Sequence, residues 1–103
     1  MNDSPEAMEK EISEIQKKLA KLGSMRPGTL GYQYRDRANK LGGYWQISYT
    51  HKRRSRSEHV KPQHVNTIKK ELANFKLFRE LTERWIDLSI EVSKAKRKRE
   101  TDL

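Results

Sequence analysis

The sequence predicts a small α+β protein in which residues 1–103 form a single domain. Apolar residues recur every three or four positions near both ends of the chain, whereas they alternate with polar residues in its middle. The first spacing is typical of helices and the second of strands. The expected order is a helix over 4–22, a glycine-rich loop over 23–43, a two-stranded antiparallel β-hairpin over 44–60, a long helix over 62–95 and a basic tail over 96–103.

The N-terminal helix is predicted from its start, its apolar seam and its end. Ser4 suits the N-cap, and Pro5 suits the first helical position because no amide donor is needed there. Gly23 is placed to end the helix in a left-handed conformation. The seam is narrow and should pack on another helix; it comprises Met8, Ile12, Ile15, Leu19 and Leu22.

The segment from Gly23 to Gly43 contains all five glycines of the protein, so we expect a loop. Its cations are Arg26, Arg35, Arg37 and Lys40, and Asp36 is the expected ion-pair partner of the neighbouring arginines. Tyr32, Tyr34 and the following Tyr44 have two interpretations. They stack on exposed bases of a nucleic acid, or they wedge the loop against the core, which is the commoner role in a short domain.

The hairpin is predicted to have one buried face and one polar face. Trp45, Ile47 and Tyr49 form the buried set. The polar face of the same strand carries Tyr44, Gln46, Ser48 and Thr50.

The register of the hairpin depends on its turn. A two-residue turn at Lys52 and Arg53 pairs Ile47 with Glu58 and Trp45 with Val60. Type I′ geometry favours a glycine, and this turn has none, so a register shifted by one residue stays open.

The long helix opens at Pro62 and carries apolar residues at helical spacing from Val65 to Val92. Its first half, with Phe75 and Phe78, suits packing on the small sheet. Its second half has a seam like that of the first helix, so the two helices pair either within one chain or across a dimer. The seam comprises Leu81, Trp85, Leu88 and Val92. The terminal "KAKRKRE" is expected to fray.

Charge is the strongest signal in the composition. The chain carries 23 Lys and Arg against 14 Asp and Glu, and residues 23–62 hold 9 of the basic and only 2 of the acidic groups. Such a local excess favours a polyanionic partner. Leu, Ile, Val and Phe together number only 20, so we also expect the protein to gain buried surface as a homo-oligomer.

Several functions are not expected. There is no cysteine, no apolar run of membrane-spanning length, and no basic and apolar leader at the start, so we expect a cytoplasmic protein with no membrane partner. His51, His59 and His64 lack the spacing of zinc ligands. No set of carboxylates suits metal-assisted nuclease chemistry, so we expect neither an enzyme nor a cofactor.

Three segments resemble a family of small uncharacterised bacterial and archaeal proteins. The family pattern has a PG-S/T-L loop, a cysteine cluster, a GPYYxLSYT-like strand, a basic turn and a long C-terminal helix. The matching stretches here are "RPGTLGYQY", "GGYWQISYT" and "ANFKLFREL", whereas "YRDRANKLGG" has no cysteine. The resemblance implies the same order of elements and a companion of mobile elements or phages. A looser likeness, to the sheet-plus-helix arm-binding modules of tyrosine recombinases, would need a third strand that the sequence does not predict.

The prediction for function follows from the hairpin. A two-stranded ribbon fits the major groove, where Arg binds guanine and Gln binds adenine. We therefore expect nucleic acid binding, with duplex DNA favoured over RNA or a single strand. The alternatives are a scaffold or inhibitor that binds a larger protein through the long helix, and a hairpin that is merely solvated. The candidate contact residues are Gln46, Ser48, Thr50, Lys52, Arg53, Arg54, Arg56, Arg35, Arg37 and Lys40.

Overall fold

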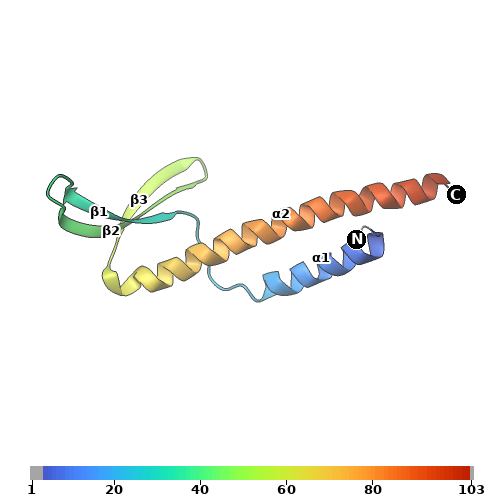
Figure 1. Ribbon diagram of the computed structural model, residues 1–103, viewed down its shortest axis with the longest axis horizontal. Helices are drawn as coiled ribbons and strands as arrows, with labels where there is room; N and C mark the ends of the chain where they lie inside the picture. The colour runs from blue at the N-terminus through green and yellow to red at the C-terminus, as the bar shows by residue number, and fades with distance from the viewer. Residues whose placement is uncertain (1–3, 103) are drawn as a thin grey trace. The chain divides into compact units, whose positions relative to one another are not determined.

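The α+β class is confirmed by the computed structural model, which describes residues 4–102 (Figure 1). Its elements are helix α1 (Pro5–Ala20), strands β1 (Thr29–Asp36), β2 (Leu41–His51) and β3 (Arg54–Val60), a 3-10 turn η1 (Pro62–His64) and helix α2 (Val65–Asp102). The chain divides into two compact units. The sheet unit is Gly23–Lys76, and the helical unit comprises Met1–Leu22 with Leu77–Leu103.

The sheet has three strands in the order β1-β2-β3, so the predicted two-stranded hairpin with a preceding loop is wrong. Strand β1 lies where the loop was expected, and it pairs with β2 from Thr29↔Ser48 to Asp36↔Leu41. Gly28 permits this approach. It has a φ of +136°, and a Cβ on it would lie 2.9 Å from the backbone oxygen of Ser48. Gly28 therefore serves a close strand contact.

The predicted register of the β2–β3 hairpin is confirmed. Ile47 pairs with Glu58 and Trp45 with Val60. Lys52 and Arg53 form the turn with φ values of +52° and +66°. Two successive positive φ values are the signature of a type I′ turn, which matches the twist of the flanking strands even without a glycine.

The apolar face of the sheet is less buried than predicted. Ile47 is fully buried at 0% exposure, whereas Trp45 and Tyr49 are only half-buried. The first turns of α2 lie on this face, because the Lys69 ammonium is 5.5 Å from the centre of the Trp45 ring. The core of this unit is therefore thin, and Ile47 is its best-covered side chain.

The helical unit pairs the two seams within one chain. Ile15 of α1 and Leu81 and Leu88 of α2 form the buried cluster. The half-buried residues packed against it are Met8, Ile12, Leu19 and Trp85. From the sequence, the two helices could pair either within one chain or across a dimer. In the structure they pair within one chain.

Both ends of α1 show how local chemistry set its length. The Ala7 amide donates to the Ser4 Oγ at 3.2 Å, so the predicted N-cap is confirmed. The predicted end is wrong, because α1 stops at Ala20 with Lys21 as a right-handed C-cap. Gly23 does not take a positive φ.

The basic tail predicted over 96–103 is helical as far as Asp102, and Leu103 lies outside the described residues. Ion pairs to α1 account for the difference. Lys96 Nζ lies 2.8 Å from Glu9 Oε1, and Arg99 donates two hydrogen bonds to the Glu6 carboxylate. Two of the tail cations are thereby engaged with the acidic first turns of α1.

Candidate nucleic-acid interface

The net charge of the chain resides in one unit. The sheet unit holds 12 of the 23 basic and 3 of the 14 acidic groups, whereas the helical unit holds 11 of each. The formal excess of +9 is thus the excess of the sheet unit alone. A polyanion that is attracted by net charge will meet this unit.

The tip of the β2–β3 hairpin forms a basic cavity of about 500 Å³. Its lining residues are Tyr49, His51, Lys52, Arg54 and Arg56, and no carboxylate is among them. Arg54 lies opposite His51 and Arg56 opposite Tyr49, so both guanidiniums are on the face that carries Ile47. The tip cations are Lys52, Arg53, Arg54 and Arg56. Within residues 4–102, none of them lies within 4.0 Å of a carboxylate.

The one acidic residue of β2 and β3 is Glu58, and it is already engaged. Its carboxylate lies 3.5 Å from the guanidinium of Arg26 and accepts a hydrogen bond of 3.0 Å from the Tyr49 hydroxyl. Arg26 also lies over the Tyr49 ring. This ion pair offsets the charge of Glu58, the one acid in the sequences of β2 and β3.

The polar face of the hairpin carries Gln46, Ser48 and Thr50, as predicted. Opposite them on β3 lie His59, Ser57 and Ser55. The hydroxyls pair across the strands, at 3.3 Å for Ser48 and Ser57 and at 2.9 Å for Thr50 and Ser55. The structure therefore separates the candidate residues, because Arg54 and Arg56 lie on the opposite face of the hairpin from Gln46, Ser48 and Thr50.

Arg35, Arg37 and Lys40 lie at the other end of the sheet. They belong to the end of β1 and to the turn that joins it to β2, whereas Lys52 and Arg53 lie at the far end of β2. Strand β2 has 11 residues, so the two groups of cations are separated by about 30 Å. The structure brings together only the tip group, and the β1–β2 turn is a second basic group.

Asp36 does not pair with the arginines around it. Its carboxylate accepts hydrogen bonds from the Asn39 backbone amide at 3.2 Å and from the Asn39 side chain at 2.9 Å. These bonds hold the pKa of Asp36 below its usual value. The predicted ion pair is wrong because an Asx-type turn satisfies the carboxylate locally, which leaves Arg35 and Arg37 available.

The tyrosines divide between the two faces of the sheet. Tyr32 makes edge contacts with Tyr34 and Trp45 at centroid distances of 5.4 and 5.2 Å. Tyr32 therefore packs within the protein, which is the second of the two interpretations. Tyr44 lies on the polar face, 4.6 Å from the His59 ring. The guanidinium of Arg35 is 5.9 Å from the Tyr44 ring.

The sequence reasoning missed this Tyr44–His59 pair, and it missed Tyr49 and His51 at the tip. The first could have been found from the predicted register, since pairing Trp45 with Val60 already places His59 diagonally across from Tyr44 on the polar face. The role of Arg26 had no signal in the sequence, because its contacts join residues far apart in the chain.

Neither a metal site nor a membrane span is found among the described residues. Within 4–102, no group of three or more His, Asp and Glu side chains is arranged to hold a metal ion. Neither described helix is long and apolar enough to cross a membrane.

Comparison of the chain with models of known protein families, with curated proteins and with solved structures gave no match.

Proposed function

We propose that the protein is a non-enzymatic nucleic-acid-binding protein that holds duplex DNA with the tip of its β2–β3 hairpin. The observation that carries the proposal is the unpaired state of the tip cations. Lys52, Arg53, Arg54 and Arg56 are exposed and lack carboxylate partners in the described chain, whereas the cations of the helical unit are matched by an equal number of acids. Unpaired cations displace the counterions of a polyanion, which is the main source of its affinity.

The shape of the tip favours a duplex. Two antiparallel strands are about 5 Å apart and fit a major groove about 12 Å wide. One face of the hairpin carries Arg54 and Arg56, and the other carries the serine and threonine hydroxyls. Both kinds of group contact phosphates and base edges in DNA-binding proteins. The looser likeness to recombinase arm-binding modules agrees with this role, and the family resemblance suggests an accessory factor of a mobile element or phage.

The test is a fluorescence-anisotropy titration against a random duplex, a single strand and an RNA hairpin at several salt concentrations. Replacing Lys52, Arg53, Arg54 and Arg56 with Ala should weaken duplex binding. It should also make the slope of log K against log salt shallower by about 2 to 4, since each phosphate neutralised contributes about −0.9.

A matched control separates the tip from net charge alone. Changing Lys10, Lys17, Lys18 and Lys21 of the helical unit to Ala removes the same four charges from exposed positions. This variant should keep the wild-type slope. Equal slopes for wild type and the tip variant on every ligand would show that the tip is not the binding element, and would favour the alternative of an acidic protein partner.

A further inference from the structure

We propose that the helical unit is a dimerisation module, in which a groove on α2 receives the same groove of a second copy of this chain in antiparallel orientation. The inference goes beyond nucleic acid binding and does not depend on it.

The groove lies on the side of α2 that α1 leaves uncovered. Leu81 and Leu88 face α1 and are buried, whereas Ile86 and Ile90 are 58% and 49% exposed. These two isoleucines and Trp85 line a depression of about 540 Å³. Large apolar side chains at neighbouring exposed positions of one helix mark an interaction surface.

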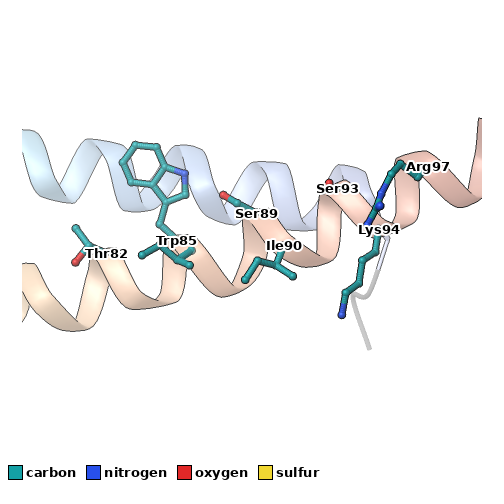
Figure 2. Close-up of a pocket in the computed structure, with 8 residues that line it drawn as sticks. Thr82, Trp85, Ser89, Ile90, Ser93, Lys94 and Arg97 are labelled. Carbon is teal, nitrogen blue, oxygen red and sulfur yellow. The ribbon is translucent and has the colours of Figure 1, made fainter.

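The small residues along the groove let another helix approach closely. Ser89 lies beside Ile90, and Ser93 lies between Ile90 and the C-terminal end of the groove, where Lys94 and Arg97 follow (Figure 2). The floor of the groove, formed by Trp85, Ile86 and Ile90, is apolar and shallow, and the C-terminal end of the groove is basic. A partner helix needs an apolar stripe with an acidic end to match it.

A second copy of α2 supplies such a stripe when it runs antiparallel. Ile86 and Ile90 lie two residues to either side of Leu88, so a crossing at the level of Leu88 places Ile86 of each copy against Ile90 of the other. Glu83 and Lys94 are 11 residues apart, close to three helical turns, and therefore share one flank of the stripe. In the same arrangement Glu83 of each copy lies beside Lys94 of the other.

The charges also fix the orientation. In a parallel pair the flank that carries Glu83 and Lys94 lies on opposite sides of the interface in the two copies, so Glu83 of one copy would not meet Lys94 of the other. In the antiparallel pair each Glu83, already 3.8 Å from Arg79 of its own chain, lies between cations of both chains. Arg97 is one turn beyond Lys94 and can reach the same carboxylate.

Net charge favours self-association through this unit. The helical unit has 11 basic and 11 acidic groups, so two copies of it do not repel each other, whereas two sheet units would. The apolar stripe is short, so we expect the dimer to bury an area at the small end of the range for specific protein–protein interfaces. We expect a Kd of about 10–100 µM.

The test is sedimentation equilibrium of the full chain, freed of nucleic acid, from about 1 µM to about 1 mM, a range that brackets the expected Kd. Wild type should shift from monomer to dimer. Glu83→Lys and Lys94→Glu should each weaken the dimer by about tenfold, because each creates two like-charge contacts. An equimolar mixture of the two variants should restore it, since each lysine introduced in the first variant then faces a glutamate introduced in the second.

Variants on the apolar floor complete the test. Ile86→Glu should abolish the dimer while the far-ultraviolet circular dichroism and melting stay those of wild type, because Ile86 is exposed in the monomer. Leu41→Glu is the matched control on the sheet unit, where Leu41 is 61% exposed, and it should leave dimerisation unchanged. A protein that stays monomeric at the highest concentration, a dimer that tolerates Ile86→Glu, or a mixture that fails to restore association would overturn the proposal.

Discussion

The guanidinium of Arg26 lies 3.5 Å from the carboxylate of Glu58 and thereby joins the segment before β1 to the basic hairpin. The same side chain lies 4.8 Å from the centre of the Tyr49 ring. The backbone amide of Arg26 donates a 3.2 Å hydrogen bond to the Glu71 carbonyl of α2. One residue therefore supports the hairpin and neutralises its single acid.

This relationship predicts opposite effects for the two partners. Arg26→Met should lower duplex affinity about three- to tenfold, because the freed Glu58 carboxylate repels phosphates beside Arg56. Glu58→Gln should raise affinity by a similar factor, and the double variant should return close to wild type. Anisotropy titrations at low and moderate salt measure all three. An unchanged affinity for Glu58→Gln would place the phosphates away from this side of the hairpin.

The turn at Lys52 and Arg53 predicts a conflict between stability and binding. A left-handed conformation costs a residue with a side chain about 1–2 kcal/mol, and both turn residues adopt it. Asn-Gly is the favoured pair for this geometry. Lys52→Asn with Arg53→Gly should therefore raise the free energy of unfolding by about 1 kcal/mol or more, while the salt slope of duplex binding becomes shallower by about 2.

The control for the turn keeps the strain and removes the charge. Lys52→Ala with Arg53→Ala should lose affinity to the same extent and gain no stability, as urea unfolding of both variants would reveal. A stabilised Asn-Gly variant with full affinity would mean that these two cations do not contact the ligand.

The sequence predicted most of the fold because its strongest signals are local. The Ser4 cap, the two helical seams and the pairing of Ile47 with Glu58 follow from spacing and turn length, and all are confirmed. Strand β1 was missed because Gly31 and the four glycines that flank the strand give the segment from Gly23 to Gly43 the composition of a loop. The alternation of Leu30, Tyr32 and Tyr34 was nevertheless present, and these residues share a face with Trp45 and Ile47.

The candidate site was predicted less completely, for a physical reason. Which cations stay unpaired depends on contacts between distant segments, such as Arg99 with Glu6, and on local satisfaction of Asp36 by Asn39. In the sequence, Arg35, Lys52 and Arg99 all carry a positive charge and have similar residues beside them. Only the folded chain distinguishes the cations that are held from those that are free.

The ion pairs of the helical unit predict a dependence on pH. Hydrogen bonds from Arg99 and Arg84 lower the pKa values of Glu6 and Glu11 below their ordinary value of 4.5. Because the folded pKa values are the lower ones, the stabilisation is complete above the ordinary value and is lost as pH falls through the folded values. Glu6→Gln with Glu11→Gln should melt below wild type at neutral pH.

The difference between that variant and wild type should vanish at a pH below the folded pKa values of the two acids. Arg84→Met with Arg99→Met should show the same convergence, since it removes the other half of each pair. Thermal melts followed by circular dichroism from neutral to strongly acidic pH supply the measurement. A difference that persists once both carboxyls are protonated would attribute the effect to packing instead of charge.

The separation of the candidate residues onto two faces of the hairpin yields the most specific prediction for binding. Gln46 lies on the polar face, whereas Arg54 and Arg56 lie on the face of Tyr49 and His51. Flat insertion of a ribbon into the major groove directs one face to the base edges, so only one set can read sequence. The hydroxyl-rich face has the donors and acceptors for that role, and the arginine face has the charge for phosphates.

Gln46→Ala should therefore relax the preference at one base pair, by about 1–3 kcal/mol of discrimination, and leave the salt slope unchanged. Arg54→Ala and Arg56→Ala should each weaken all sequences alike and make the slope shallower by about 1. Selection from a randomised duplex library, followed by titration of the enriched sequence and a scrambled one at several salt concentrations, measures both quantities. If Arg54→Ala changes the selected sequence while Gln46→Ala does not, the hairpin reads bases with its other face, and the polar face is directed away from the DNA.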